Sequence, residues 1–166
     1  DSENLTAELI VKHIGSTVYD TIGTWKNGLL AIKTFLHDTV GIDTNTIGLS
    51  DGSGLSRYNY SSPNHFITLL SWAYNNKNTR NPFLNTFPIG GLDGTLVDRL
   101  EDIDTSTTIL AKTGSLSGVN CLSGYIVSKT NSTLAFSILM NGFVNSSKPY
   151  RKLQDDIIYA LTELKL

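Results

Sequence analysis

Lys112, Thr113 and Gly114 directly follow an apolar run, 109–111, that is typical of a β-strand. A strand residue with a long cationic side chain, followed by a hydroxyl and a glycine, can present an anion site at an edge that another backbone approaches closely. By itself the triplet is a weak signal, because it also describes a solvated strand end and a turn. An anion site therefore needs support from a second motif elsewhere in the chain.

Ser2, Glu3 and Asn4 stand near the start of the chain and have the Ser-x-Asn form. In serine β-lactamases and penicillin-binding proteins, a motif of this kind accompanies Lys-Thr-Gly and a nucleophilic Ser-x-x-Lys motif. The alternative is local, because a serine or asparagine just before a helix can cap its free backbone N–H groups. The order and context of the motifs decide between the two interpretations.

Asp51 and Ser53 lie in a glycine-rich stretch that could also be considered for a nucleophile. The Gly-x-Ser-x-Gly elbow of α/β-hydrolases is absent, since Asp51 rather than glycine stands two residues before Ser53. A Ser53, His65 and Asp51 set is conceivable, but nothing in the sequence brings these side chains together. Turn chemistry explains both residues, and likewise Asp93 and Gly94, so we expect scaffold roles for all four.

The composition limits the possible classes of protein. A chain of 166 residues, 40% of them apolar, can bury a core and is expected to form one domain. A formal net charge of −2 and a pI near 5.9 leave no basic stripe for nucleic acid. No apolar run approaches the ~20 residues that span a bilayer, so no transmembrane segment is expected.

The cysteine and histidine residues of the sequence give little support for a metal site or a disulfide. Cys121 is the only cysteine, which excludes a disulfide framework and a Cys-based metal site, and its alternating neighbours indicate a buried structural thiol. The histidines match no zinc signature and are expected at helix surfaces or caps. We therefore expect no cofactor. The histidines are His13, His37 and His65.

Helical periodicity dominates the first half of the chain. Residues 4–14 carry apolar side chains at helical spacing and are predicted to end at Gly15, and residues 24–40 repeat the pattern up to Gly41. Residues 43–62 are dense in Gly, Ser, Asn and Asp and are expected to be mostly loop. Ser62 and Pro63 then predict the start of a third helix. Its predicted buried face is Phe66, Leu69, Leu70 and Ala73.

The strand signal comes late. Residues 76–104 have a weak pattern and are expected to form short helical turns and loops. Residues 107–114, 120–128 and 133–143 are rich in β-branched and apolar residues, and a polar turn at 129–132 joins the last two, which predicts three antiparallel strands in sequence order. The tail predicts a closing helix packed across the sheet. Its predicted buried face is Leu153, Ile157, Ala160, Leu161 and Leu164.

Longer segments in a fixed order are more specific than either triplet. Through them the chain resembles the D-alanyl-D-alanine carboxypeptidase/endopeptidase family of low-molecular-mass, class C type penicillin-binding proteins. The resemblance covers nearly the whole chain and implies an α+β, β-lactamase/transpeptidase-like fold with an antiparallel sheet flanked by helices. Residues 1–166 would be the C-terminal segment of its catalytic domain, with no separate second domain. The segments are DSENLTAELIVKHIG, LSDGSGLSRYNYSSPNHF, PIGGLDGTL and AKTGSLSGVNCLSGYI.

The resemblance implies an activity and roles for the motif residues. Family members remove the terminal D-Ala from peptidoglycan stem peptides through an acyl-enzyme on a serine, which β-lactam antibiotics trap. Ser2 would relay a proton to the departing amine, because a hydroxyl both accepts and donates. Asn4 would orient the substrate amide and the catalytic lysine of the Ser-x-x-Lys motif. Lys112 would supply positive potential for the terminal carboxylate of the substrate.

Three residues would complete the substrate site by the same resemblance. The hydroxyls of Thr113 and Ser115 would hydrogen-bond the carboxylate, and Gly114 would leave room for the substrate beside the strand. The backbone N–H of Ser115 would form half of the oxyanion hole, a contribution of about 3 kcal/mol to the barrier. Because peptidoglycan lies outside the cytoplasmic membrane, the resemblance implies a periplasmic or extracellular location.

The nucleophile of the family is missing from this sequence, since no serine has a lysine three residues later. We therefore expect the chain to be inactive alone and to be the C-terminal part of a longer enzyme, with the first strands and the Ser-x-x-Lys helix upstream. The sheet edge left open would favour association with that segment, or a homo-oligomer. The alternative is a non-catalytic module of the same fold that binds peptidoglycan peptides or another protein.

Overall fold

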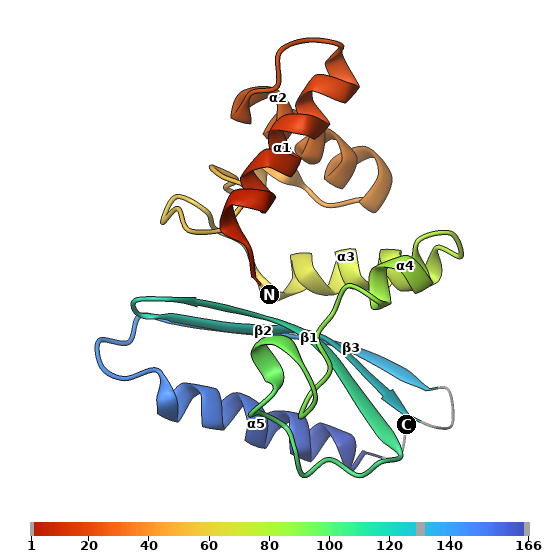
Figure 1. The fold of residues 1–166 in the computed structure, drawn as a ribbon, viewed down its shortest axis with the longest axis vertical. Helices are drawn as coiled ribbons and strands as arrows, with labels where there is room; N and C mark the ends of the chain where they lie inside the picture. The colour runs from red at the N-terminus through yellow and green to blue at the C-terminus, as the bar shows by residue number, and fades with distance from the viewer. Residues whose placement is uncertain (1, 129–131, 165–166) are drawn as a thin grey trace. The chain divides into compact units, whose positions relative to one another are not determined.

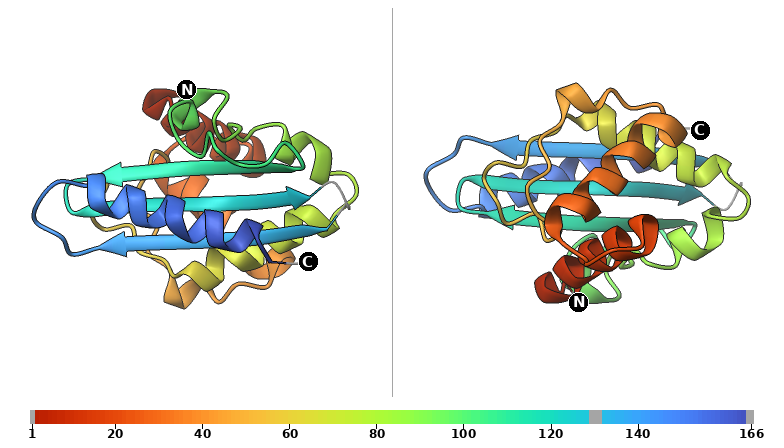
Figure 2. Two further views of the ribbon diagram at one scale, coloured as in Figure 1. Left: turned by 90° about the horizontal axis from the view of Figure 1, so that it is seen from below. Right: turned by 90° about the horizontal axis from the view of Figure 1, so that it is seen from above.

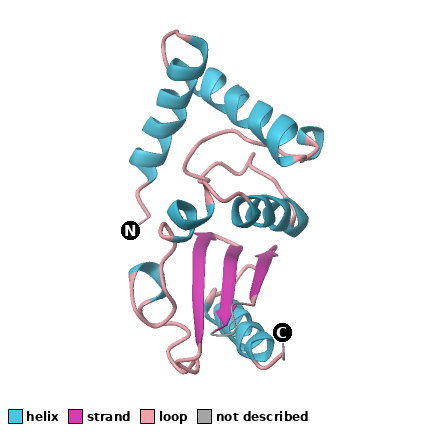
Figure 3. Ribbon diagram, turned by 90° about the vertical axis from the view of Figure 1, so that its right-hand side faces the viewer, coloured by secondary structure: helices cyan, strands magenta, loops and turns pink. Residues whose placement is uncertain are grey.

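The computed structural model describes residues 2–128 and 132–164. The chain divides into two units, residues 1–69 and 70–166. Helices and loops make up the first unit, and the second contains the sheet and the C-terminal helix (Figure 3). The expectation that residues 1–166 form one catalytic-domain segment without a second domain stays a prediction.

The first helix, α1 (Asn4–Tyr19), passes through Gly15, so the predicted end at this glycine is wrong. Gly15 is buried against α2 (Trp25–Phe35), where a Cβ atom on Gly15 would lie 2.5 Å from the backbone nitrogen of Gly28. The glycine therefore allows two helix backbones to approach closely. The helix ends instead at Asp20, which has a left-handed φ of 48° and donates its backbone N–H to Ser16 O.

The second predicted helix end is confirmed. A π-helical turn, Leu36–Val40, continues α2 and ends at Gly41, whose φ of 82° suits glycine. A loop with one 3₁₀ turn, Thr44–Thr46, leads to α3 (Pro63–Asn75), which begins at the predicted proline.

The predicted buried face of α3 is only partly correct. Leu70 and Ala73 are buried, and Leu69 is half-buried. Phe66 is 37% exposed, so this aromatic residue does not belong to the core of the described structure. The boundary between the two units falls within α3, between Leu69 and Leu70.

The sheet of the second unit has the predicted strands and order. Strands β1 (Thr107–Leu116), β2 (Val119–Ser128) and β3 (Thr133–Asn141) are antiparallel neighbours in the order β1-β2-β3 (Figure 1). Upstream, α4 (Arg80–Leu84) and a 3₁₀ turn, Gly94–Leu96, confirm the expected short helical turns. The predicted turn at 129–132 lies outside the described residues, apart from Ser132.

Helix α5 (Lys148–Thr162) packs across one face of the sheet, as predicted (Figure 2). Its predicted buried face is only partly correct: Leu161 packs against the core, but Leu153 and Leu164 are 50% and 52% exposed. The fully buried residues of the helix are Gln154 and Ile158. The core between helix and sheet is formed by Leu96, Leu100, Ile109, Ala111, Leu122, Ile126, Phe136 and Ile158.

Hydrogen bonds explain why a glutamine lies at the centre of the buried face of α5. The amide of Gln154 donates to Asn120 O at 3.1 Å, and its oxygen accepts from the Arg99 guanidinium at 3.2 Å. Arg99 also forms an ion pair with Asp155 at 2.6 Å. A buried polar group whose hydrogen bonds are satisfied costs little free energy, so α5 can bury Gln154 while Leu153 stays exposed.

Candidate active site

The Lys-Thr-Gly motif lies within β1, followed by Ser115 in the same strand. Side chains alternate along a strand, so Lys112 and Gly114 share one face and Thr113 and Ser115 the other. Ala111 is buried in the core beneath α5, and Thr113 lies on the same face of the strand as Ala111. Lys112 is exposed, as expected for a residue that is not part of the core.

A second segment covers part of the outer edge of β1. The backbone N–H of Gly90 donates to Ile109 O at 2.9 Å, and that of Ala111 donates to Pro88 O at 3.1 Å. These bonds show that the backbone groups of Ile109 and Ala111 point away from β2. In an antiparallel ladder the outward-pointing residues alternate, so Thr113 and Ser115 also direct their backbone groups to this outer edge.

Lys112 reaches the same edge. Its ammonium Nζ donates to the backbone carbonyl of Thr113 at 2.5 Å. Partial desolvation lowers the pKa of Lys112 below its ordinary value of 10.5. The cationic group of Lys112 and the outward backbone groups of Thr113 and Ser115 therefore lie along one strand edge, where they could contact an anionic, peptide-like ligand.

Thr113 has a partner that the sequence reasoning missed. Its Oγ1 donates to Oγ1 of Thr95 at 2.8 Å. Thr95 belongs to the 3₁₀ turn Gly94–Leu96 and lies in the segment PIGGLDGTL. The family resemblance of that segment was the one sequence signal that could have pointed to Thr95. The sequence analysis attributed the segment to turn formation by Asp93 and Gly94 and gave Thr95 no role.

Gly114 is not required by the packing of the chain. A Cβ atom there would meet only Cys121 Cβ among the nearest atoms, at an ordinary contact of 3.6 Å. Gly124 on β2 differs, because its Cβ would lie 2.0 Å from Leu110 O. Cys121 is half-buried, and burial raises the pKa of its thiol.

Ser2 and Asn4 lie at the start of α1, in the first unit, and both are exposed. The N-cap position is Glu3, whose side chain makes no capping hydrogen bond. The capping alternative for the Ser-x-Asn motif is therefore not supported. Lys112 belongs to the second unit.

One helical turn after Asn4, Glu8 holds the glycine-rich loop. Its carboxylate accepts hydrogen bonds from the backbone N–H groups of Gly52 and Ser53, at 3.0 and 2.9 Å. The indole Nε1 of Trp25 donates to the same carboxylate at 2.7 Å. The Ser53 side chain, followed by the Gly52 N–H, lowers the pKa of Glu8 from 4.5 to about 2.

The residues considered for a different nucleophile have structural roles. Asp51 accepts hydrogen bonds from the backbone N–H groups of Gly54 and Ser56, at 2.8 and 2.6 Å. Nδ1 of His65 accepts the backbone N–H of Ser62 at 3.2 Å, and its Nε2 lies 3.1 Å from Thr46 Oγ1. The expected scaffold role of Asp51 and the cap role of His65 are confirmed.

Asp93 is likewise a scaffold residue. Its Oδ1 accepts the backbone N–H of Ile89 at 2.6 Å, which closes the turn that leads into Thr95. Gly94 follows with a φ of 55°, a conformation that favours glycine.

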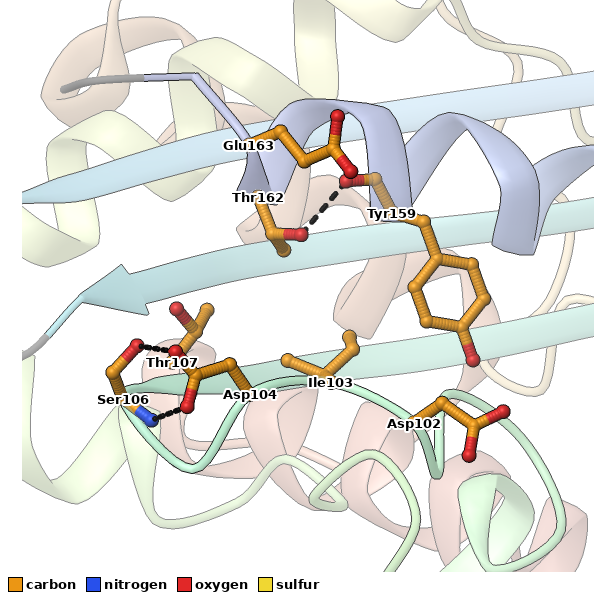
Figure 4. Close-up of a pocket in the computed structure, with 8 residues that line it drawn as sticks. All are labelled: Asp102, Ile103, Asp104, Ser106, Thr107, Tyr159, Thr162 and Glu163. Atoms are coloured by element: carbon orange, nitrogen blue, oxygen red, sulfur yellow. Dashed lines mark hydrogen bonds between the residues drawn. The ribbon is translucent and has the colours of Figure 1, made fainter.

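A cavity of about 310 Å³ lies between α5 and the segment that leads into β1 (Figure 4). Its polar groups bond to one another: the carboxylate of Asp104 accepts the Ser106 N–H and hydroxyl, and Thr162 donates to Tyr159 O. The cavity contains none of the motif residues. Its lining is Asp102, Ile103, Asp104, Ser106, Thr107, Tyr159, Thr162 and Glu163.

Within residues 2–128 and 132–164, no three His, Cys, Asp or Glu side chains gather as a metal site would need. In the same part of the chain, no helix is both long enough and apolar enough to cross a membrane.

Sequence comparisons with a family model and with curated proteins indicate the same family. The model of the D-Ala-D-Ala carboxypeptidase 3 (S13) family matches residues 1–164. Penicillin-sensitive carboxypeptidase A of Dictyostelium discoideum is 30% identical over 99% of this chain and 33% of its own length. A D-alanyl-D-alanine carboxypeptidase of an Actinomadura species is 36% identical over 98% of this chain and 30% of its own length. The chain thus spans about a third of these relatives.

Solved structures agree on the fold. Penicillin binding protein 4 from Haemophilus influenzae superposes with a TM-score of 0.86 at 28% identity, over 99% of this chain and 38% of that one. The same protein in complex with a β-lactam gives a TM-score of 0.85. The TLA-3 β-lactamase, at 18% identity and a TM-score of 0.75, shows the fold alone over 98% of this chain and 59% of its own. The expected β-lactamase/transpeptidase-like fold is therefore confirmed.

Proposed function

Because the chain belongs to the D-Ala-D-Ala carboxypeptidase 3 (S13) family, we propose that it is part of a serine-type D-Ala-D-Ala carboxypeptidase that acts on peptidoglycan stem peptides through an acyl-enzyme. One observation carries the proposal: the outer edge of β1 presents Lys112, Thr113 and Ser115 together, next to a glycine that the packing does not require. The proposed location is periplasmic or extracellular, where peptidoglycan is found.

In the proposed complex the substrate peptide lies along the outer edge of β1. Gly114 leaves the space that a side chain would fill, and the outward N–H of Ser115 donates to the oxyanion that develops at the scissile carbonyl. The terminal carboxylate of the substrate lies beside the Lys112 ammonium and accepts hydrogen bonds from the hydroxyls of Thr113 and Ser115. β-Lactams would bind along the same edge as acylating analogues.

By the family resemblance, the Ser-x-Asn motif would supply the groups for proton transfer. The exposed hydroxyl of Ser2 can accept and donate a proton, and the amide of Asn4 offers a donor and an acceptor without adding charge. Neither residue occupies the N-cap position of α1, which is Glu3, and this supports a functional reason for the motif.

We place the nucleophilic Ser-x-x-Lys motif in the part of the relatives' length that this chain does not span. No serine of the chain has a lysine three residues later, so residues 1–166 alone should form no acyl-enzyme. The same observation favours one alternative, a non-catalytic module of this fold that binds peptidoglycan peptides or another protein.

Release of D-Ala distinguishes the two functions. The full-length native protein and residues 1–166 are each incubated with a stem pentapeptide that ends in D-Ala-D-Ala, and free D-Ala is quantified. We expect release by the full-length protein and none by residues 1–166. A full-length protein that binds the pentapeptide without releasing D-Ala would support the binding module and contradict the carboxypeptidase.

A further inference from the structure

The contact between Thr95 and Thr113 joins the Lys-Thr-Gly strand to a residue that the sequence analysis gave no role. The two Oγ1 atoms are 2.8 Å apart, a normal distance between hydroxyl groups. Thr113 is half-buried, whereas Thr95 is exposed. The contact therefore lies at the surface end of the Thr113 side chain, where a ligand would approach.

The turn that carries Thr95 is fixed to β1 on both sides. Before it, the segment 88–90 pairs with β1 through the bridge between Ile89 and Leu110. After it, Leu96 is fully buried in the core that contains Ile109 and Ala111. The position of Thr95 relative to Thr113 is consequently set by the backbone of the second unit rather than by one flexible side chain.

A count of protons shows what this contact can do. Each hydroxyl has one proton to donate and can accept through its oxygen, so a pair of hydroxyls shares one internal hydrogen bond and keeps one proton for a third group. If Thr113 donates to an anion, its oxygen is free to accept the proton of Thr95. The bond between the two threonines can reverse without a change in the position of either oxygen.

We propose that Thr95 is a positioning residue of the substrate site, which donates to Thr113 and so directs the Thr113 proton to the terminal carboxylate of the substrate. The inference rests on the proposed function and adds to it a residue that sets the preference for a free carboxylate. Thr95 acts through Thr113 and touches no reacting atom. The charge of the carboxylate makes the hydrogen bond from Thr113 stronger than one between neutral groups.

The test uses the full-length native protein and two versions of one stem peptide, which end in a D-Ala carboxylate or in its carboxamide. Thr95→Val keeps the shape but removes the donor, and we expect it to lower kcat/KM for the carboxylate about tenfold. We expect the carboxamide to lose less than about twofold, and Thr95→Ser to restore the wild-type ratio of the two rates. Because both rates come from one preparation, partial misfolding cannot change their ratio.

A double-mutant cycle separates action through Thr113 from a separate role. In a Thr113→Val background, Thr95→Val should leave the ratio of the two rates unchanged. Thr108→Val, the same substitution elsewhere on β1, serves as the matched control and should leave the ratio at the wild-type value. An unaltered ratio in Thr95→Val, or an equal loss for both substrates, would overturn the inference. A wild-type protein that releases no D-Ala would overturn the proposed function and this inference with it.

Discussion

Two glycines of the sheet show how single residues separate fold from function. A methyl group on Gly124 would collide with the backbone at Leu110 O, 2.0 Å away, whereas one on Gly114 would make an ordinary contact at 3.6 Å. Glycine within a strand lowers the stability of the fold, and the packing around Gly114 gives no reason for a glycine there. Space for a substrate backbone is the reason we assign to it.

Substitution of each glycine by alanine tests this assignment. We expect Gly114→Ala in the full-length protein to change the free energy of unfolding by less than about 1 kcal/mol and to slow acylation by a penicillin at least about tenfold. Gly124→Ala should lower the stability by about 3 kcal/mol or more, because backbone atoms cannot move aside. Thermal denaturation and stopped-flow acylation measure the two effects. Acylation of Gly114→Ala at the wild-type rate would show that Gly114 is not needed to make room for the substrate.

The limits of the sequence are also visible at single residues. Lys112, Thr113 and Gly114 could be predicted because a triplet of types within a strand is a local signal. Thr95 could not, because its distance to Thr113 depends on the pairing of residues 88–90 with β1, a long-range contact. The predicted helix end at Gly15 is wrong for a similar reason. Glycine is favoured both where a helix ends and where two helices pack closely, and the sequence alone does not distinguish the two.

At the scale of elements, α1 and the glycine-rich loop are joined through one carboxylate. Glu8 accepts the backbone N–H groups of Gly52 and Ser53, one turn after the Ser-x-Asn motif. A Cβ on Gly52 would lie 2.7 Å from Ala7 O, so the loop lies directly against the helix. This clamp keeps the start of α1 and the loop in one fixed arrangement within the first unit.

The pH dependence of the clamp follows from the pKa of Glu8, which is lowered from 4.5 to about 2. The stabilisation is fully present above the unfolded value of 4.5 and is lost as the pH falls through about 2, where the folded state takes up the proton. Amide resonances of Gly52 and Ser53 should titrate with a midpoint near 2, and Glu8→Gln should abolish that titration. A midpoint near 4.5 would contradict the clamp.

Helix α5 illustrates a second property of elements. Its apolar pattern predicted an apolar buried face, but the buried face centres on Gln154, which bonds to Asn120 and Arg99. The spacing of apolar residues does not predict that an amide is buried when its hydrogen-bond partners lie far away in the sequence. The presence and direction of the helix could be predicted, and its rotation about its own axis could not.

Substitutions on the two faces of α5 test this rotation. Gln154→Leu keeps the volume but removes the amide that donates to the carbonyl of Asn120 and one acceptor of the Arg99 guanidinium, so we expect a loss of about 2 kcal/mol. Leu153→Gln, on the exposed side, should change the stability by less than about 0.5 kcal/mol. Thermal denaturation of both variants gives the comparison. Greater damage from Leu153→Gln would support the face predicted from the pattern.

At the scale of the whole molecule, the fold class could be predicted because the strands carry β-branched runs, the helices carry clear periodicity and the motifs occur in the family order. A TM-score of 0.86 against penicillin binding protein 4 of Haemophilus influenzae confirms it. The chain spans about a third of its curated relatives, and the expected association at the open sheet edge, with a missing segment or a second copy, stays a prediction.

The central claim is that the edge from Lys112 to Ser115 serves an acyl-enzyme whose nucleophile lies outside this chain. Intact-mass spectrometry after incubation with a labelled penicillin tests it most directly. We predict one covalent adduct on the full-length protein, on the serine of a Ser-x-x-Lys motif, none on residues 1–166, and strongly slowed labelling of a folded Lys112→Ala variant. A full-length protein that stays unlabelled, or a Lys112→Ala variant labelled at the wild-type rate, would contradict the account.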